Sequence, residues 1–258
     1  KGMKRGEWIM IPLAMLLFTA STFGQKKWDG EGLDSLWSNE RNWFPDGIPL
    51  PSDDVIIDNE RFSGMYKIIL PTGLTAVTVQ SISILPRTGN AIVIELPSNN
   101  IATPALTIAS TGPSFRIGKS GTFINSSGAS SGNPIVINGS FSIENGGRYV
   151  HRTQRGNATI VSKLLLDPST HQGIFEFDVP GNAGYTLSVS GKQFGTLLLS
   201  SASAGRKSYA GSGTSALRIY GDFEIADSSS FTSSVNNNIR IGSNLVVKGK
   251  SIVLLHKP

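Results

Sequence analysis

Short runs in which apolar and polar residues alternate are the dominant pattern of this chain. Three stretches, at residues 135–143, 217–225 and 239–247, align without a gap, and each holds two alternating three-residue runs joined by a tight polar corner. The second and third stretches lie 22 residues apart, and the first precedes the second by 82 residues, close to four such periods. Alternation predicts half-buried strands, and a repeat of this length predicts a parallel β-helix, or β-solenoid, whose like positions stack from coil to coil.

Similar runs occur before the first of these stretches. Between residues 65 and 106 they are short, rich in β-branched residues, and interrupted by Pro and Gly, as strands with corners should be. We therefore predict an all-β chain with a β-solenoid over residues 61–258. Between about 149 and 185 the strand-like runs fit no 22-residue period. For this segment we predict an excursion from the solenoid, in the form of a small sheet lying along one face.

Residues 25–60 differ in character from the rest of the chain. They hold Trp28, Trp37 and Trp43, three of the four tryptophans, among Gly, Pro and Asp. A solenoid must cover its first coil, because an open end exposes strand edges and a bare core. We predict that this segment is a Trp-rich N-terminal cap. The alternative interpretation is a carbohydrate-binding platform, since aromatic faces bind sugar rings, and it requires at least two exposed, coplanar indoles.

The N-terminus has the pattern of a secretory signal peptide. An apolar run at residues 8–20 follows Lys4 and Arg5 and precedes a stretch of small residues. The run is too short for a membrane-spanning helix of about 20 residues, so residues 1–24 are predicted to be cleaved, leaving no membrane span in the mature chain. This predicts a secreted or cell-surface protein. The chain stops abruptly after a strand-like run, and we expect the natural protein to continue beyond Pro258.

Composition narrows the class of protein further. The 29 glycines and the 16% of charged residues favour a turn-rich β protein. Without cysteine, an exported chain is stabilised by its core alone and cannot carry a lipid on an N-terminal Cys. Loss of residues 1–24 lowers the net charge from +5 to +3, and the basic residues form no stripe. Nucleic acid is therefore not predicted as a partner.

Motif searches return no catalytic signature. The G-x-S-x-G pattern at residues 128–132 enters a strand instead of a helix, which indicates a turn and not a hydrolase elbow. The three histidines are too far apart for a recognised metal spacing. Asp53, Asp54 and Asp58 could offer oxygen ligands to Ca²⁺, and the alternative is that they hydrogen-bond local backbone at corners. No other metal or cofactor is predicted.

Two sets of side chains are candidates for a functional site on the solenoid. In the aligned stretches Arg218 and Arg240 share one position, which predicts two arginines one coil apart that could meet acidic sugars. Alternatively, they belong to an ordinary solvated face. The second set lies in the predicted excursion and would serve a polysaccharide-active lyase or hydrolase, with roles for His151, Arg152, Glu176 and Asp178.

The chain resembles the long secreted β-solenoid proteins of Bacteroidota, many of which carry a C-terminal type IX secretion sorting domain. The resemblance rests on the Trp-rich opening from Trp28 to Ile57 and on the repeating run from Phe194 to Val247. It implies a solenoid fold and contact with an export machinery. Members include adhesins, uncharacterised surface proteins and carriers of enzyme modules. The resemblance assigns no catalytic residue, because this region of the family has no established catalytic motif.

These observations favour a non-enzymatic, secreted or cell-surface scaffold with an adhesin-like role, whose partners would be extracellular polysaccharides or cell-surface glycans. Two alternatives stay open at this point. A polysaccharide-active enzyme requires the side chains of His151, Arg152, Glu176 and Asp178 to gather around one groove. A carbohydrate-binding module requires exposed indoles in the Trp-rich segment.

Overall fold

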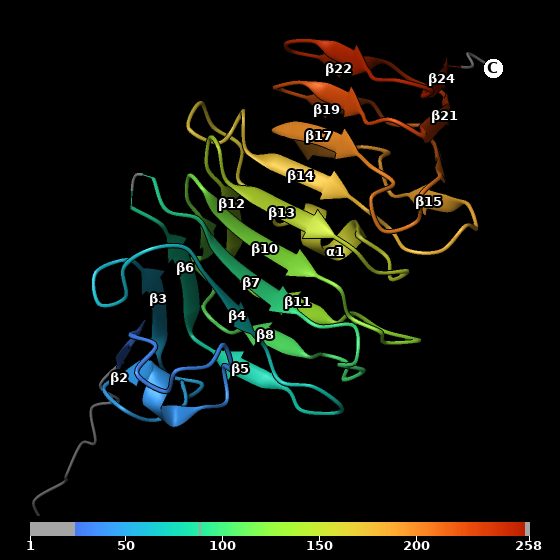
Figure 1. The fold of residues 1–258 in the computed structure, drawn as a ribbon. Coiled ribbons are helices and arrows are strands. Elements are labelled where there is room, and N and C mark those ends of the chain that lie inside the picture. The colour runs from blue at the N-terminus through green and yellow to red at the C-terminus, as the bar shows by residue number, and fades with distance from the viewer. Residues whose placement is uncertain (1–23, 88, 256–258) are drawn as a thin grey trace, which may run out of the picture.

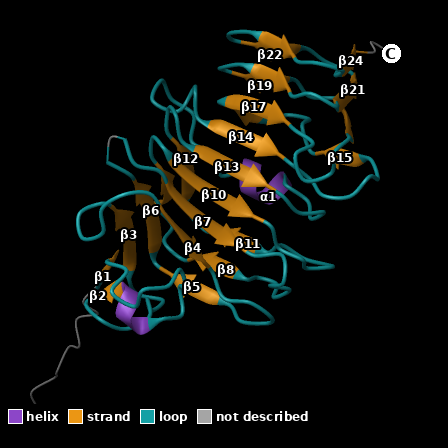
Figure 2. Cartoon of the chain, viewed as in Figure 1, coloured by secondary structure: helices purple, strands orange, loops and turns teal. Residues whose placement is uncertain are grey.

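The chain folds into a β-solenoid, in which parallel strands from successive coils stack along one axis (Figures 1 and 2). The computed structural model describes residues 24–87 and 89–255, so the predicted signal peptide lies outside the described part apart from Gly24. A regular coil places one strand on each of three faces in turn. The alternating pattern of the sequence therefore predicted the fold class correctly, because alternation sends every second side chain into the interior.

Face 2 runs through the whole solenoid as an eight-stranded sheet and appears as the ladder of arrows in Figure 1. All its neighbouring strands are parallel and in register. In spatial order its strands are β4 (Tyr66–Ile69), β7 (Ile92–Leu96), β10 (Gly121–Asn125), β13 (Arg148–His151), β14 (Ile174–Phe177), β17 (Thr196–Leu199), β20 (Phe223–Ile225) and β23 (Leu245–Val247).

Faces 1 and 3 each consist of two sheets in succession. The first sheet of face 1 consists, in spatial order, of β2 (Trp43–Phe44), β1 (Gln25–Trp28), β3 (Asp54–Asp58), β6 (Ser81–Leu85), β9 (Pro113–Ile117) and β12 (Ser140–Ile143). Its second sheet consists of β16 (Gln193–Phe194), β19 (Leu217–Ile219) and β22 (Ile239–Ile241). Face 3 begins with β5 (Val77–Val79), β8 (Leu106–Ile108) and β11 (Ile135–Ile137), and resumes with β15 (Tyr185–Leu187), β18 (Lys207–Gly213), β21 (Ser229–Val235) and β24 (Ile252–Leu255).

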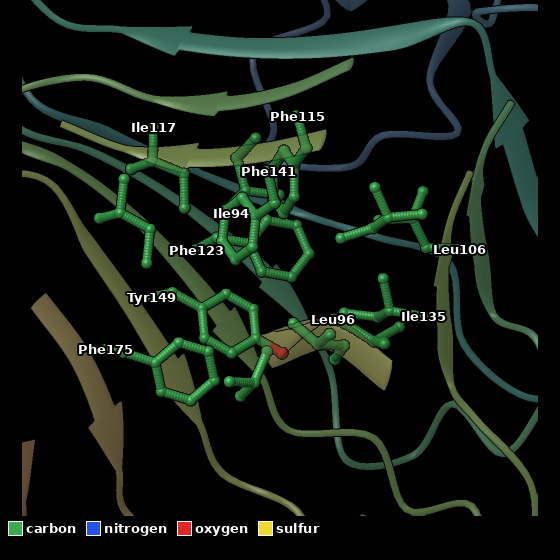
Figure 3. Packing of buried hydrophobic residues seen from close by; sticks show 14 of the residues in the cluster. Ile94, Leu96, Leu106, Phe115, Ile117, Phe123, Ile135, Phe141, Tyr149 and Phe175 are labelled. Atoms are coloured by element: carbon green, nitrogen blue, oxygen red, sulfur yellow. The ribbon is translucent and has the colours of Figure 1, made fainter. Parts of the chain in front are cut away.

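Stacked rows of apolar side chains fill the interior. On face 2 the buried row includes Ile94, Phe123, Tyr149 and Phe175, and Figure 3 shows these residues one above the other. The rings of Phe123 and Tyr149 stack with centroids 6.0 Å apart and planes inclined by only 4°. Because parallel pairing places like positions about 4.8 Å apart, each buried side chain contacts the coils on both sides, and the coils stabilise one another.

The predicted repeat needs one correction. Leu217 pairs with Ile239 and Phe223 with Leu245, as the 22-residue period predicted. The stretch at 135–143, however, lies at the corner between faces 3 and 1, whereas the other two stretches lie at the corner between faces 1 and 2. The first stretch is therefore not their structural equivalent. Coil length also varies, since Ile82 pairs with Phe115, which is 33 residues further along the chain.

The segment at about 149–185 also differs from the predicted small sheet along one face. Its strands β13 and β14 pair with each other and with β10 and β17, so they belong to face 2 of the solenoid itself. Only the connection between them departs from the regular coil. It holds helix α1 (Ala158–Val161), which lies beside β11, and an irregular stretch in which Leu164 forms a single bridge to Phe141.

The Trp-rich segment covers the N-terminal end of the stack. Strand β2 pairs antiparallel with β1, which pairs parallel with β3, so face 1 ends in a short hairpin-like edge. The backbone N–H of Trp37 donates to the carbonyl of Ile69, which closes part of the edge of β4. A 3-10 helix, η1 (Glu40–Asn42), joins these parts.

Among the described residues no helix is long and apolar enough to cross a membrane.

Candidate functional site

The four candidate catalytic side chains lie on two neighbouring strands and the corners after them. His151 is on β13 and Glu176 on β14, and the corners that follow hold Arg152 and Asp178. The four side chains do not gather around one groove. His151 is fully buried and points into the core, where its ring packs on Phe177 at 5.4 Å. Glu176 follows Phe175 on β14 and therefore points away from the interior. The wall of the solenoid separates the imidazole from this carboxylate, so His151 and Glu176 do not share an acid–base site.

The two carboxylates of this set are held by hydrogen bonds and ion pairs. Glu176 is buried, forms an ion pair with Arg148 and accepts a hydrogen bond from the Ser200 hydroxyl at 2.6 Å. Asp178 is also buried, pairs with Arg152 at 2.9 Å, and accepts a hydrogen bond from the Ser203 backbone N–H at 2.8 Å. A buried carboxylate is costly without such hydrogen-bonded partners, and each pair links one coil to the next.

His151 is buried from solvent, and this burial disfavours the charged form of its imidazole. Its Nε2 lies 2.8 Å from the Arg155 carbonyl oxygen and 3.1 Å from the Tyr185 hydroxyl, and its Nδ1 has no hydrogen-bond partner among the described residues. Burial lowers the pKa of His151 from 6.5 to about 4, and the hydrogen bond to Arg155 offsets only part of this effect. The imidazole is therefore neutral in the folded protein at neutral pH.

This lowered pKa predicts a specific acid sensitivity. The unfolded chain binds a proton at His151 below pH 6.5, whereas the folded chain does so only near pH 4, so the free energy of unfolding falls as the pH falls through this window. The loss is about 1.4 kcal/mol per pH unit and about 3 kcal/mol in total. Urea unfolding from neutral pH down to about pH 4 should show it.

A variant without the titrating group isolates this contribution. Phe177 holds the same position on the next coil, so His151→Phe fits the local packing and should lose less stability than the natural chain on acidification. His171→Gln, which removes a half-exposed histidine, should leave the acid sensitivity unchanged. Equal losses in the natural chain and in His151→Phe would contradict the assignment.

The three tryptophans of the N-terminal segment are buried and do not form a sugar-binding platform. All three indoles are at most 2% exposed. Trp43 meets Trp28 at 5.1 Å with perpendicular rings and Trp37 at 4.7 Å with rings inclined by 68°. The Trp43 Nε1 donates to the Trp37 carbonyl oxygen at 2.8 Å. The condition of two exposed, coplanar indoles is not met, and these residues pack inside the cap.

The three aspartates considered for Ca²⁺ bond neighbouring groups of the chain. Asp53 accepts a hydrogen bond from the Leu50 N–H at 2.7 Å, and Asp58 accepts one from the Glu60 N–H at 2.8 Å. Asp54 accepts a hydrogen bond from the Ser81 hydroxyl on the next coil. Within residues 24–87 and 89–255, no three His, Asp or Glu side chains are grouped as a metal site would require.

Arg218 and Arg240 lie as the sequence predicted, directly opposite each other on β19 and β22. Both are exposed on face 1. The guanidinium of Arg218 lies 5.1 Å from the centre of the Tyr220 ring, within the range of a cation–π contact. Tyr220 in turn donates a hydrogen bond to the side-chain carbonyl of Gln193 at 2.9 Å. The contacts of Arg218 thus lead to Tyr220 at the corner between faces 1 and 2, whereas Arg240 lies one coil further along face 1.

A groove at this corner was not predicted. It has a volume of about 550 Å³ and is lined by residues that include His171, Gln172, Thr196, Tyr220, Asp222 and Glu224. These six residues come from the irregular connection before β14 and from the two coils that hold β17 and β20. The sequence pattern marked none of them as part of a site, because the connection has no repeat that would place His171 beside Tyr220.

Comparison with known protein families, curated proteins and solved structures found no match for the chain.

Proposed function

We propose that this chain is a non-catalytic β-solenoid scaffold, secreted or held at the cell surface, with an adhesin-like role. The observation that carries the proposal is the state of the two buried carboxylates. Glu176 is engaged by Arg148 and Ser200, and Asp178 by Arg152 and Ser203, while His151 lies on the other side of the solenoid wall. A general acid and base must reach the same substrate bond, and the separation of His151 from these engaged carboxylates supports a non-catalytic role.

The other parts of the proposal rest on sequence patterns. The apolar run at 8–20 after Lys4 and Arg5 supports export, and the resemblance to secreted solenoid proteins supports contact with an export machinery. Glycans and other extracellular polysaccharides are the proposed partners. A rigid stack of coils suits this role, because it presents side chains from successive coils at a fixed spacing.

An activity assay tests the non-catalytic assignment. The purified chain would be incubated with neutral and acidic polysaccharides, and new reducing ends and the ultraviolet absorbance of unsaturated lyase products would be measured. We expect no product above the level seen with Glu176→Gln and Asp178→Asn. Product formed by the natural chain and abolished in either variant would overturn the scaffold proposal in favour of an enzyme.

A fusion experiment tests export separately. The whole chain would be joined to a phosphatase reporter that is active only outside the cytoplasm, with a matched fusion lacking residues 8–20. We expect reporter activity from the first fusion and a loss of this activity in the second, because the apolar run is what the export machinery recognises. Equal activity in the two fusions would contradict export through this segment.

A further inference from the structure

The groove between faces 1 and 2 lies beside two closely packed glycine corners and the irregular connection before β14. A Cβ atom on Gly195 would lie 2.7 Å from the Gly173 carbonyl oxygen, and one on Gly221 would lie 2.5 Å from the Thr196 hydroxyl. Only glycine fits this close approach of neighbouring coils. Gly221 lines the groove, and Gly195 directly precedes Thr196, which also lines it.

One wall of the groove is aromatic. The rings of His171 and Tyr220 stack with centroids 4.4 Å apart and planes inclined by 15°. His171 comes from the irregular connection before β14, and Tyr220 from the corner between β19 and β20, with the corner at Gly195 between them. The stacked pair therefore bridges across an intervening coil. Each ring covers one face of the other, so the ring edges and the face of His171 turned away from Tyr220 are the aromatic surface that can contact the C–H groups of a sugar.

The remaining lining is rich in hydrogen-bonding groups and carries negative charge. Asp222 accepts hydrogen bonds from the backbone and the side-chain amide of Asn244 at 2.9 and 3.0 Å. A hydrogen bond from the Ser243 hydroxyl, followed by the two bonds from Asn244, lowers the pKa of Asp222, which favours the charged carboxylate. Glu224 points to the same side of β20 two residues later and pairs with Lys248. Gln172 and Thr196 add an amide and a hydroxyl.

We propose that this groove binds a neutral, unbranched oligosaccharide. The carboxylates accept hydrogen bonds from sugar hydroxyls and would repel an acidic chain, while the His171–Tyr220 stack supplies the apolar contact. Coils repeat about every 4.8 Å, close to the length of one sugar unit, so an extended chain lying along the groove meets a new coil with each ring. The proposal rests on the scaffold function and deepens it by naming the class of ligand.

Titration of the whole ¹⁵N-labelled chain with cellohexaose, xylohexaose, mannohexaose and laminarihexaose, followed by NMR, tests the site. We expect saturable binding of at least one of them, with the largest shifts at the amides of Gly195 and Gly221. Tyr220→Ala should weaken binding by about tenfold, and Asp222→Asn should weaken it as well. Arg240→Ser, an exposed position on face 1 outside the groove, should bind as the natural chain does.

Three outcomes would overturn the proposal. The first is that none of the four neutral hexasaccharides binds. The second is that the shifts of the natural chain cluster away from Gly195 and Gly221, a readout that stands even if Tyr220→Ala fails to fold. The third comes from a parallel titration with the acidic hexagalacturonate: binding of this ligand alone, abolished in Arg240→Ser, would place an acidic ligand on the arginine pair. Turnover of a bound sugar would refute the non-catalytic scaffold and leave the binding site in place.

Discussion

Replacing Trp43 by alanine should lower the free energy of unfolding by about 4 kcal/mol and expose the first coils to solvent. Trp43 is fully buried, packs against both other indoles of the cap and donates a hydrogen bond to Trp37. Its backbone also pairs with Trp28, which joins β2 to β1. Without the indole, the cap loses its centre, and the strand edges of β3 and β4 lose their cover. Urea unfolding measures the total loss.

Hydrogen exchange should show where this destabilisation acts. In Trp43→Ala, amides of β3 and β4 should lose protection first, while those of β20 and β21 should keep it, because each coil is stabilised mainly by its neighbours. Phe44→Ala is the matched control. Phe44 is adjacent and 44% exposed, with only the Arg61 guanidinium above its ring, so its loss should cost about 1 kcal/mol or less. Unchanged protection of β3 and β4 in Trp43→Ala would show that the segment is not a cap.

A single methyl group at Gly139 should cost about 3 kcal/mol of stability. Gly139 lies at the corner between β11 and β12. The preceding coil passes so closely there that a Cβ on Gly139 would clash with the Gly112 carbonyl oxygen. The same Cβ would lie 2.7 Å from the Ser110 carbonyl oxygen and 2.8 Å from the Ser114 hydroxyl. Two of these three atoms belong to the backbone, so the clash cannot be relieved by turning a flexible side chain. The two coils would have to separate locally.

Gly112, on the opposite side of this contact, is the natural comparison. A Cβ there would approach only the Ser110 hydroxyl, at 3.9 Å, and its φ is not in the left-handed region. Gly112→Ala should therefore be neutral or stabilise the fold by about 0.5 kcal/mol, through the lower entropy of the unfolded chain. Urea midpoints of the two variants give the comparison. Equal effects would mean that close stacking at this corner is not what requires glycine.

The strand pattern was predictable because inward and outward positions alternate strictly. In β6 the buried Ile82 and Ile84 alternate with serines, whereas in β3 and β7 the apolar Ile56 and Val93 occupy half-buried outward positions. The equivalence of coils was less predictable. Each coil has three corners of similar composition, so the stretch at 135–143 matched two others that lie at a different corner. Sequence similarity between corners cannot distinguish repetition within a coil from repetition between coils.

The segment at about 149–185 shows a second limit. Its irregular spacing suggested a departure from the solenoid, yet Tyr149 and Phe175 pair in register on face 2. A solenoid tolerates this irregularity because only the strands need to meet, and the connection between β13 and β14 can bulge into solvent. Loop length therefore reports poorly on whether a strand stays in the stack.

The arrangement of the candidate functional residues was also only partly predictable from the sequence. The adjacency of Arg218 and Arg240 followed from the 22-residue period, since both lie where that period is exact. The separation of His151 from Glu176 depended on which side of the strands each residue occupies, and the alternation around Phe175 already indicated it. The groove at Tyr220 and His171 could not be predicted, because it joins a regular corner to an irregular connection.

The amino-acid sequence by itself determined the class of fold, the side of most strands that points into the core and the position of the cap, because these depend on local alternation and on clusters of tryptophan. Only the tertiary structure decided which coils are neighbours, which charged side chains are paired, and where the surface is hollowed. Those features depend on contacts between residues roughly 22 to 33 positions or more apart, and connections of variable length conceal such contacts in the linear chain.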